Sequence, residues 1–350
     1  MSTRIKYYNH HKPFGLENGQ ELPELCIAYH TYGKLNAARD NVVWICHALT
    51  ASSDAADWWS GLVGAGQALD PEHYFIVCAN MLGSCYGTTG PLTSYPGSKQ
   101  PYYSQFPAVT IRDVVKAHIL LREHLGIEQI RLLVGGSMGG YQALEWCAME
   151  GNRIQQLFLL ATAARESAWG VAIHTAQRLA IEADNTWQEQ SGTAGSAGLK
   201  AARAIGMLTY RNYELLVRQQ TDTDPEKLDH FQVESYIRYQ GQKLVNRFNA
   251  YSYWLLTKAM DSHNISRVRG GQVEKVLQEL QQRALVIGIS SDILCPAAEQ
   301  QFICRHMPRA RYVEINSAYG HDGFLIESEK ISAHLVPLLE RSQEEGIGCS

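Results

Sequence analysis

The chain has 350 residues, of which 45% are hydrophobic and 19% charged, with a formal net charge of −4 at pH 7. This composition allows a large buried core, and the near-neutral charge without a basic cluster argues against nucleic acid or an acidic membrane as a partner. No apolar run reaches the length of a membrane span, and residues 1–8 lack the apolar core of a signal peptide, so we expect a cytosolic protein.

The first part of the chain predicts strands of a mainly parallel sheet. Residues 1–23 are polar and rich in turn formers, whereas 24–32 supply β-branched and aromatic residues suited to an early strand. Continuous apolar runs at 41–46 and 74–79 are typical of strands buried on both faces.

A serine flanked by glycines lies near the middle of the sequence. Residues 109–122 have helical spacing of apolar side chains, with His118 expected on the helix surface. The apolar run 130–134 then leads into Gly135-Gly-Ser137-Met-Gly139, followed by helix-forming residues. This is the G-x-S-x-G pattern of a nucleophile elbow, a sharp turn that exposes the serine hydroxyl. The pattern alone is common by chance, and an N-capping serine is the alternative, but its place between strand and helix favours Ser137 as a nucleophile.

The loop at 47–52 follows the buried strand 41–46. In α/β-hydrolase-type enzymes this position presents a backbone N–H to the oxyanion hole. Leu49, or alternatively Thr50, is the expected donor, and the N–H of Met138 supplies the second. Because these are backbone roles, a plain strand-to-helix loop remains the alternative.

The pattern changes after residue 164. Residues 154–161 form another expected strand and complete an alternation of strands and helices, which is typical of a parallel sheet covered on both faces. Helical periodicity then dominates 165–283, and strand-like sequence resumes at 284–289. The helical stretches are 169–183, 198–207 and 232–260. We predict an α/β-hydrolase core of residues 1–164 and 284–350, with 165–283 inserted as a helical lid that restricts entry and excludes water.

Two polar residues after late strand-like runs extend the catalytic pattern. Asp292 follows one run and His321 the next, so the chain order Ser, Asp, His is that of the α/β-hydrolase triad. We predict a triad of Ser137, Asp292 and His321; a turn aspartate and a capping or surface histidine are the alternatives. Asp322 is adjacent to His321 and poorly placed to reach its back nitrogen, so a substrate-binding role suits it better.

Other reactive side chains receive no catalytic role. The eight cysteines include no C-x-x-C pair, and several lie in strand-like runs, which indicates reduced core thiols rather than a metal cage or disulfide framework. Asp261 and Glu299 are expected as solvated surface acids. Residues 342–350 are expected to be a frayed end.

Short motifs spread nearly from end to end resemble one known family, the homoserine O-acetyltransferases. They include His47-Ala-Leu-Thr, Gly83-Ser-Cys-Tyr-Gly-Thr-Thr-Gly-Pro, Gly135-Gly-Ser-Met-Gly-Gly, Gly206-Met-Leu-Thr-Tyr-Arg, Glu234-Ser-Tyr-Ile-Arg-Tyr-Gln-Gly, Lys258-Ala-Met-Asp, Ser291-Asp and Gly320-His-Asp-Gly-Phe. Several lie in the predicted lid, which differs widely among unrelated hydrolases. The resemblance implies acyl-CoA-dependent enzymes of methionine biosynthesis on an α/β-hydrolase fold.

The resemblance also implies how substrates are held. Arg211 and Asp322 would hold the amino acid, because homoserine carries a carboxylate for a guanidinium and an ammonium for a carboxylate. Tyr236 and Arg178 are further expected pocket residues. The implied co-substrate is acetyl-CoA, with no bound cofactor and no metal, and the implied assembly is a homodimer formed through the lid helices.

Two departures from the family pattern concern the acyl donor. Ser84 occupies the place of an expected second glycine after Gly83, and Ala51 follows Thr50 where glycine is usual. Relatives that use succinyl-CoA, or serine as acceptor, share the triad, so homoserine O-succinyltransferase and serine O-acyltransferase are alternatives. A serine esterase or thioesterase, and a non-catalytic binding protein of the same fold, are the remaining ones.

Overall fold

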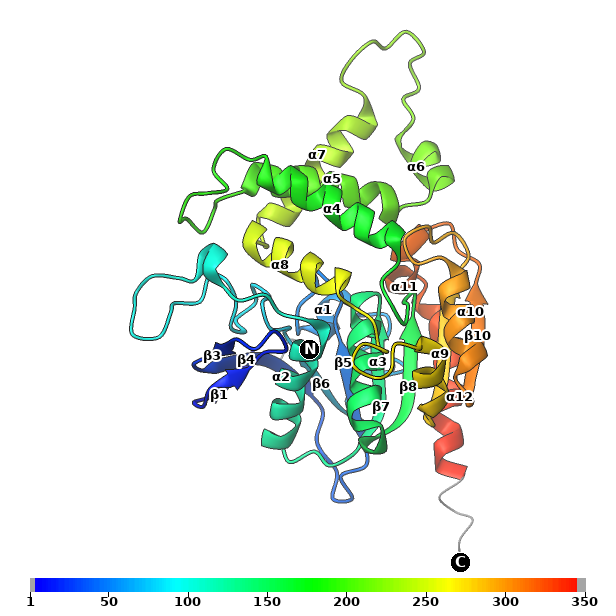
Figure 1. Ribbon diagram of the computed structural model, residues 1–350. Helices are drawn as coiled ribbons and strands as arrows, with labels where there is room; N and C mark the ends of the chain where they lie inside the picture. Colours follow the sequence, from blue (N-terminus) through cyan, green and yellow to red (C-terminus); the bar gives the residue numbers. More distant parts are fainter. Residues whose placement is uncertain (1–3, 345–350) are drawn as a thin grey trace, which may run out of the picture.

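The computed structural model describes residues 4–344, and within them one eight-stranded sheet runs through the molecule (Figure 1). Its order is β1-β4-β6-β5-β7-β8-β9-β10, with β1, β4 and β6 paired antiparallel and the pairs from β6 to β10 parallel. The strands, including the separate hairpin β2-β3, are β1 (Lys6–His10), β2 (Phe14–Gly15), β3 (Glu21–Leu22), β4 (Leu25–Tyr32), β5 (Val42–Cys46), β6 (Phe75–Ala79), β7 (Ile130–Gly136), β8 (Ile154–Leu160), β9 (Arg283–Ile289) and β10 (Ala310–Ile315). The predicted α/β-hydrolase fold is confirmed.

The N-terminal region contains more structure than its turn-rich sequence indicated. β1 pairs with β4, Lys6 opposite Tyr29, and becomes the edge of the sheet. Its five residues are exposed or half-buried, so the sequence lacks the alternation of apolar and polar side chains that predicts a strand. Pairing with β4, rather than burial, holds this segment extended.

Helices cover both faces of the sheet. The helices are α1 (Ala55–Trp58), α2 (Ile111–His124), α3 (Met138–Glu150), α4 (Ala168–Glu182), α5 (Ser196–Tyr210), α6 (Tyr213–Gln220), α7 (Gln232–Val245), α8 (Ala250–Asp261), α9 (Val273–Glu279), α10 (Ala297–His306), α11 (Gly323–Ile326) and α12 (Ser328–Glu344), with short 3-10 turns at Tyr103–Gln105, Gly151–Arg153 and Gly320–Asp322. Along β5, Val42, Trp44 and Cys46 join the core under α2 and α3, whereas Val43 and Ile45 join the core under α1 and α12. This two-sided burial explains the continuous apolar run.

His118 is a correction to the sequence analysis. It is fully buried rather than exposed on α2, and its ring lies near those of Trp44 and Trp146. Neither ring nitrogen has a hydrogen-bond partner among the described residues. Burial, together with the nearby His47, lowers the pKa of His118 to about 3, so the ring is uncharged at neutral pH.

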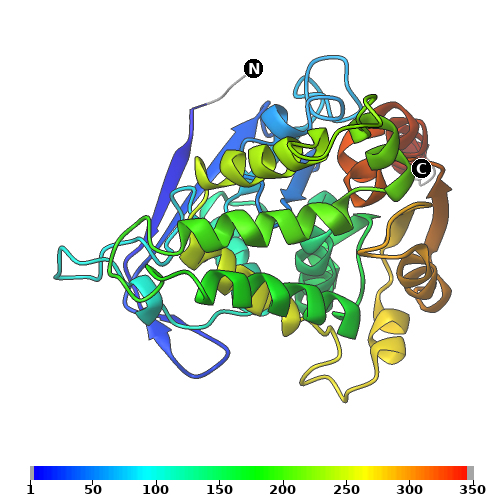
Figure 2. The same cartoon turned by 90° about the horizontal axis from the view of Figure 1, so that it is seen from above.

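The helices of the predicted lid, α4 to α8, lie above the ends of the parallel strands, with α4 and α5 side by side in the view from above (Figures 1 and 2). The periodic stretch 232–260 is two helices, and Asn249 caps the second by accepting from the Ser252 N–H at 2.8 Å. α9 also falls within the expected insertion, but it lies beside α10 rather than with the other lid helices (Figure 1).

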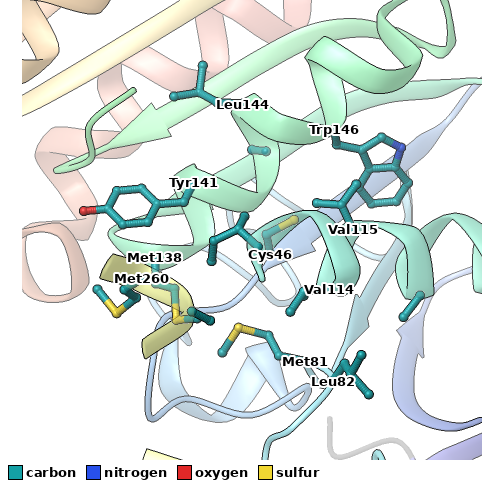
Figure 3. Packing of buried hydrophobic residues seen from close by; sticks show 14 of the residues in the cluster. Cys46, Met81, Leu82, Val114, Val115, Met138, Tyr141, Leu144, Trp146 and Met260 are labelled. Carbon is teal, nitrogen blue, oxygen red and sulfur yellow. The ribbon is translucent and has the colours of Figure 1, made fainter. Parts of the chain in front are cut away.

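The lid is tied to the sheet through apolar packing. Figure 3 shows Met260 of α8 beside Met138, the first residue of α3, within one buried hydrophobic cluster. The same cluster contains Trp146 of α3 and Val115 of α2.

No helix within residues 4–344 has the length and apolar character of a membrane span. The expected frayed tail lies largely outside the described residues, since α12 extends to Glu344.

Candidate active site

Ser137 lies at the turn between β7 and α3. Its backbone has φ 54° and ψ −127°, a left-handed region that L-residues rarely occupy. The turn is tight because α3 starts against β5: a Cβ on Gly139 would lie 2.1 Å from the carbonyl oxygen of Cys46. Likewise, a Cβ on Gly140 would lie 2.3 Å from Thr162 Oγ1. The glycines therefore permit the close approach that places the serine at the sheet edge.

Three residues from distant parts of the chain meet at this turn. His321 Nε2 is 2.8 Å from Ser137 Oγ, and His321 Nδ1 is 2.7 Å from Asp292 Oδ2. The other carboxylate oxygen of Asp292 accepts from the N–H groups of Leu294 at 2.8 Å and Cys295 at 2.9 Å. All three side chains are nearly buried. The residues predicted as a triad thus form one continuous hydrogen-bonded chain, as proton transfer from the serine requires.

The electrostatics of His321 suit a general base. Burial by itself lowers the pKa of this histidine, but the charge and hydrogen bond of Asp292, with the charges of Asp322 and Glu166, outweigh it. The net result is a pKa above the ordinary histidine value. A raised pKa strengthens the ring as an acceptor of the Ser137 proton.

Backbone donors are available on the other side of Ser137. Leu49 and Thr50 lie in the loop after β5 and line the same cavity as the serine. In residues 4–344 the Leu49 N–H makes no backbone or side-chain hydrogen bond. Met138 is the first residue of α3, where helical N–H groups lack intrahelical partners. This arrangement leaves N–H groups free to bind an oxyanion.

A cavity of about 530 Å³ opens above the serine. Its walls come from the loop after β5, from the lid helices α4, α5, α7 and α8, and from the segment around His321. Its charged lining residues are Asp57, Arg203, Lys243, Arg247 and Asp322. The volume suits a small ligand, and the mixed charges suit a ligand that carries both signs.

Arg211 and Asp322 meet beside the triad. Arg211 Nε lies 3.4 Å from Asp322 Oδ2 as an ion pair. Burial raises the pKa of Asp322, although Arg211, His321 and Arg203 oppose this effect. Asp322 lines the cavity, whereas Arg211 is not among the described residues that do.

Two other predicted pocket residues lie elsewhere. Tyr236, on α7, is not among the described residues that line the cavity. Arg178 is buried in α4 and donates to Asp261 Oδ2 at 2.6 Å, while His174 Nδ1 lies 3.0 Å from the other oxygen of Asp261. Asp261 is therefore an ion-paired, mostly buried residue rather than the solvated surface acid expected.

Lid residues that the sequence analysis did not single out line the cavity. They are Ile173, His174, Gln177, Arg203 and Tyr210 from α4 and α5. Each has an apolar or helical context that gives no catalytic signal by itself. Of these five, only Tyr210 lies within one of the family motifs, the one that ends in Arg211.

Comparison with known proteins identifies the family to which the chain belongs. A family model described as the alpha/beta hydrolase fold matches residues 41–328. A homoserine O-acetyltransferase of Cyclobacterium marinum is 48% identical over 331 residues, which cover 95% of this chain and 93% of that protein. A homoserine O-acetyltransferase of Trichormus variabilis is 44% identical, with 96% of this chain and 94% of that protein covered.

The chain belongs to the homoserine O-acetyltransferase family.

Solved structures show how widely this fold is shared. Homoserine O-acetyltransferase from Bacillus anthracis superimposes with a TM-score of 0.88 at 23% identity, covering 97% of this chain and 98% of that one. An acetylester hydrolase from Corynebacterium glutamicum superimposes with a TM-score of 0.86 at 22% identity, covering 96% of each chain. A homoserine O-acetyltransferase and an ester hydrolase thus share this fold, so the fold by itself does not distinguish the two activities.

Proposed function

We propose that this chain is an acyltransferase that moves the acetyl group of acetyl-CoA to the side-chain hydroxyl of L-homoserine. The observation that carries the proposal is the 48% identity to a homoserine O-acetyltransferase over nearly the whole chain. The ion pair between Arg211 and Asp322, next to His321, supports an amino acid as acceptor. A cytosolic location belongs to the same proposal.

The first half-reaction acetylates Ser137. His321, held through Nδ1 by Asp292, takes the serine proton as Oγ attacks the thioester carbonyl. The N–H groups of Leu49 and Met138 stabilise the negative charge on the carbonyl oxygen. When the C–S bond breaks, His321 returns the proton to the sulfur, and free coenzyme A leaves.

The second half-reaction transfers the acetyl group to the acceptor. The homoserine hydroxyl gives its proton to His321 and attacks the acetyl-serine carbonyl. The ester bond to Ser137 then breaks, the serine oxygen regains the proton, and O-acetylhomoserine leaves. Arg211 is assigned to the carboxylate of homoserine and Asp322 to its ammonium. One site acting on two substrates in turn requires ping-pong kinetics, and an intersecting double-reciprocal pattern would contradict the mechanism.

Water competes as acceptor because it is far more concentrated than homoserine. A positioned hydroxyl can gain an effective molarity on the order of 10⁵ M, which is enough to overcome this difference. The lid helices above the cavity and the Arg211–Asp322 pair are assigned to this positioning. A site without such positioning would act as an esterase.

A homodimer through the lid helices is part of the proposal. Several large apolar side chains of the lid are exposed, which supports this surface as the interface. They are Leu179 (58% exposed), Leu208 (60%), Tyr213 (79%) and Tyr239 (60%). Sedimentation analysis of the wild type and of L208E with Y239E tests it: the variant should be monomeric, and an unchanged dimer would move the interface elsewhere.

The function is tested with the purified protein and two donors. Acetyl-CoA or succinyl-CoA is mixed with L-homoserine, L-serine or buffer alone, free thiol is followed, and the product is identified by mass. We expect thiol release that depends on homoserine and yields O-acetylhomoserine. Preference for succinyl-CoA or serine would replace the substrate assignment, equal release into water would make the protein a hydrolase, and failure of a serine-reactive probe to label Ser137 would indicate a binding protein.

A further inference from the structure

Two polar side chains of the predicted lid line the cavity with buried nitrogen or oxygen atoms that have no hydrogen-bond partner within residues 4–344. Gln177, on α4, is 1% exposed, and neither its Nε2 nor its Oε1 has a hydrogen-bond partner in residues 4–344. It nevertheless lines the cavity. A buried amide left without partners costs folding free energy, so its presence is explained best by a ligand that bonds to it.

Arg203, on α5, is the second of these groups. It lines the cavity, its Nε is buried without a hydrogen-bond partner, and it forms no ion pair within the described residues. Its guanidinium carbon lies 5.1 Å from the ring centre of Tyr210. The other arginine that lines the cavity, Arg247, donates to the Thr50 carbonyl and the Tyr86 hydroxyl. Arg203 is therefore the lining guanidinium still free to bind an anion.

Both groups converge on the part of the cavity beside the general base. A Cβ on Gly206 would be 3.0 Å from Gln177 Nε2 and 3.0 Å from the Tyr210 ring, so the amide and this ring are neighbours. The Tyr210 ring centre is in turn 6.0 Å from that of His321. Arg203 is also close enough to Asp322 to act on its charge. Gln177 and Arg203 thus both lie near the Tyr210 ring, which in turn lies beside the ring of His321.

The charges of the lining residues indicate which group of a ligand binds near Arg203 and Gln177. Arg211 already faces Asp322 at 3.4 Å, so a second nearby guanidinium can add a contact to the acceptor carboxylate that Arg211 binds. Arg203 supplies this guanidinium, and the Gln177 amide supplies a neutral donor. The cations Lys243 and Arg247, at exposed positions of the cavity, are better placed for the phosphates of a donor such as coenzyme A. The α-carboxylate of the acceptor is therefore the group that matches the charge of Arg203 and the donor of Gln177.

We propose that Arg203 and Gln177 form a second arm of the acceptor site, which binds the α-carboxylate of the amino-acid substrate alongside Arg211. This inference rests on the proposed function, because it assumes an amino-acid acceptor. It assigns acceptor specificity to residues on α4 and α5 that neither belong to the triad nor form the Arg211–Asp322 pair.

The test compares R203Q with the wild type on two acceptors. L-homoserine and 3-aminopropan-1-ol share the hydroxyl and the ammonium, but the second lacks the carboxylate. R203Q should lower kcat/KM for homoserine roughly 10- to 100-fold, as expected when a charged hydrogen bond is lost, and change it less than about twofold for 3-aminopropan-1-ol. R203K should recover part of the loss. R238Q, which alters a surface arginine of α7 that is 77% exposed, is the matched control and should behave as the wild type.

Other results would overturn the inference. An equal loss with both acceptors would indicate a structural role for Arg203. A raised KM for acetyl-CoA, with the homoserine KM unchanged, would assign Arg203 to the donor. If the wild type showed no homoserine-dependent thiol release, the proposed function itself would fail. Acetylation of Ser137 by p-nitrophenyl acetate, which carries no carboxylate, should be unchanged in R203Q and serves to show that the variant is folded.

Gln177 has a test that does not depend on activity. Q177M keeps the side-chain length but removes the unpartnered amide, so Tm should rise roughly 2 to 4 °C while the homoserine KM increases. Q300M is the matched control: Gln300 Nε2 donates to Thr162 O at 2.6 Å and Cys295 O at 3.3 Å, so this change should lower Tm. A fall in Tm for Q177M would show that the amide has a structural partner and would contradict the assignment.

Discussion

Asp292→Asn separates the orienting role of the carboxylate from its size. Oδ1 of Asp292 accepts from two backbone N–H groups, of Leu294 and Cys295, whereas Oδ2 faces His321 Nδ1. An asparagine must place its carbonyl oxygen against the two N–H donors, because its NH₂ group cannot accept. The NH₂ group therefore faces His321 Nδ1 and donates to it. That contact selects the tautomer with the proton on Nε2, which cannot accept the proton of Ser137.

The expected loss is large because the wrong tautomer removes the general base altogether. Loss of this kind lowers kcat on the order of 10⁴-fold, equivalent to about 5 kcal/mol of transition-state stabilisation. The assay is thiol release from acetyl-CoA with saturating homoserine at pH 7.5, and Tm is measured on the same samples. Tm should change little, since the amide keeps both backbone contacts.

Glu299→Gln is the matched control for this change. Glu299 is a neighbouring acid in the first turn of α10, and it makes no contact with the triad in the described residues. E299Q should keep wild-type activity. A loss of less than about tenfold in D292N, or an equal loss in E299Q, would refute the role assigned to Asp292.

Three further predictions concern pH and packing. His321 must be neutral to act as the base, and its pKa is raised, so kcat/KM should fall as the pH decreases. The midpoint of this fall should lie above the ordinary histidine pKa of about 6.5. A profile that stays flat down to pH 6 would contradict this. Gly139→Val should yield little soluble protein, since a Cβ there would lie 2.1 Å from the Cys46 carbonyl oxygen; a Tm within 2 °C of wild type, roughly the effect of 1 kcal/mol or less, would contradict the packing argument. His118, with a pKa near 3 in the folded state, gains a proton on unfolding between pH 3 and 6.5, so wild-type stability should decline with acid in that window. Between pH 7 and pH 5, the free energy of unfolding measured in urea should decrease by roughly 2 kcal/mol less for His118→Leu than for the wild type. Equal decreases would show that the ring is not held uncharged.

The features predicted well from sequence are those that a few neighbouring residues determine. The apolar run of β5 predicts a strand because successive side chains are buried on opposite faces of the sheet. The glycines around Ser137 mark the elbow because only a residue without Cβ allows β5 and α3 to approach there. The order of Asp292 and His321 after successive strands follows from parallel strands presenting their carboxyl ends at one edge.

Features that depend on contacts between distant segments were missed. β1 is extended because it pairs with β4, and His118 is buried because Trp44 and Trp146 pack around it. No local pattern distinguishes such a histidine from a surface one. The same holds for Asp261, whose burial depends on Arg178 of another lid helix.

The sequence by itself determined the alternating strands and helices, the serine turn and the residues that follow the late strands, because these depend on local periodicity and close backbone approach. The tertiary structure alone decided which lid side chains face the serine. Gln177 and Arg203 are 26 residues apart on separate helices, and they meet beside Tyr210 only because α4 and α5 pack side by side over the strand ends. Packing of two helices sets that proximity, and no short pattern in either helix encodes it.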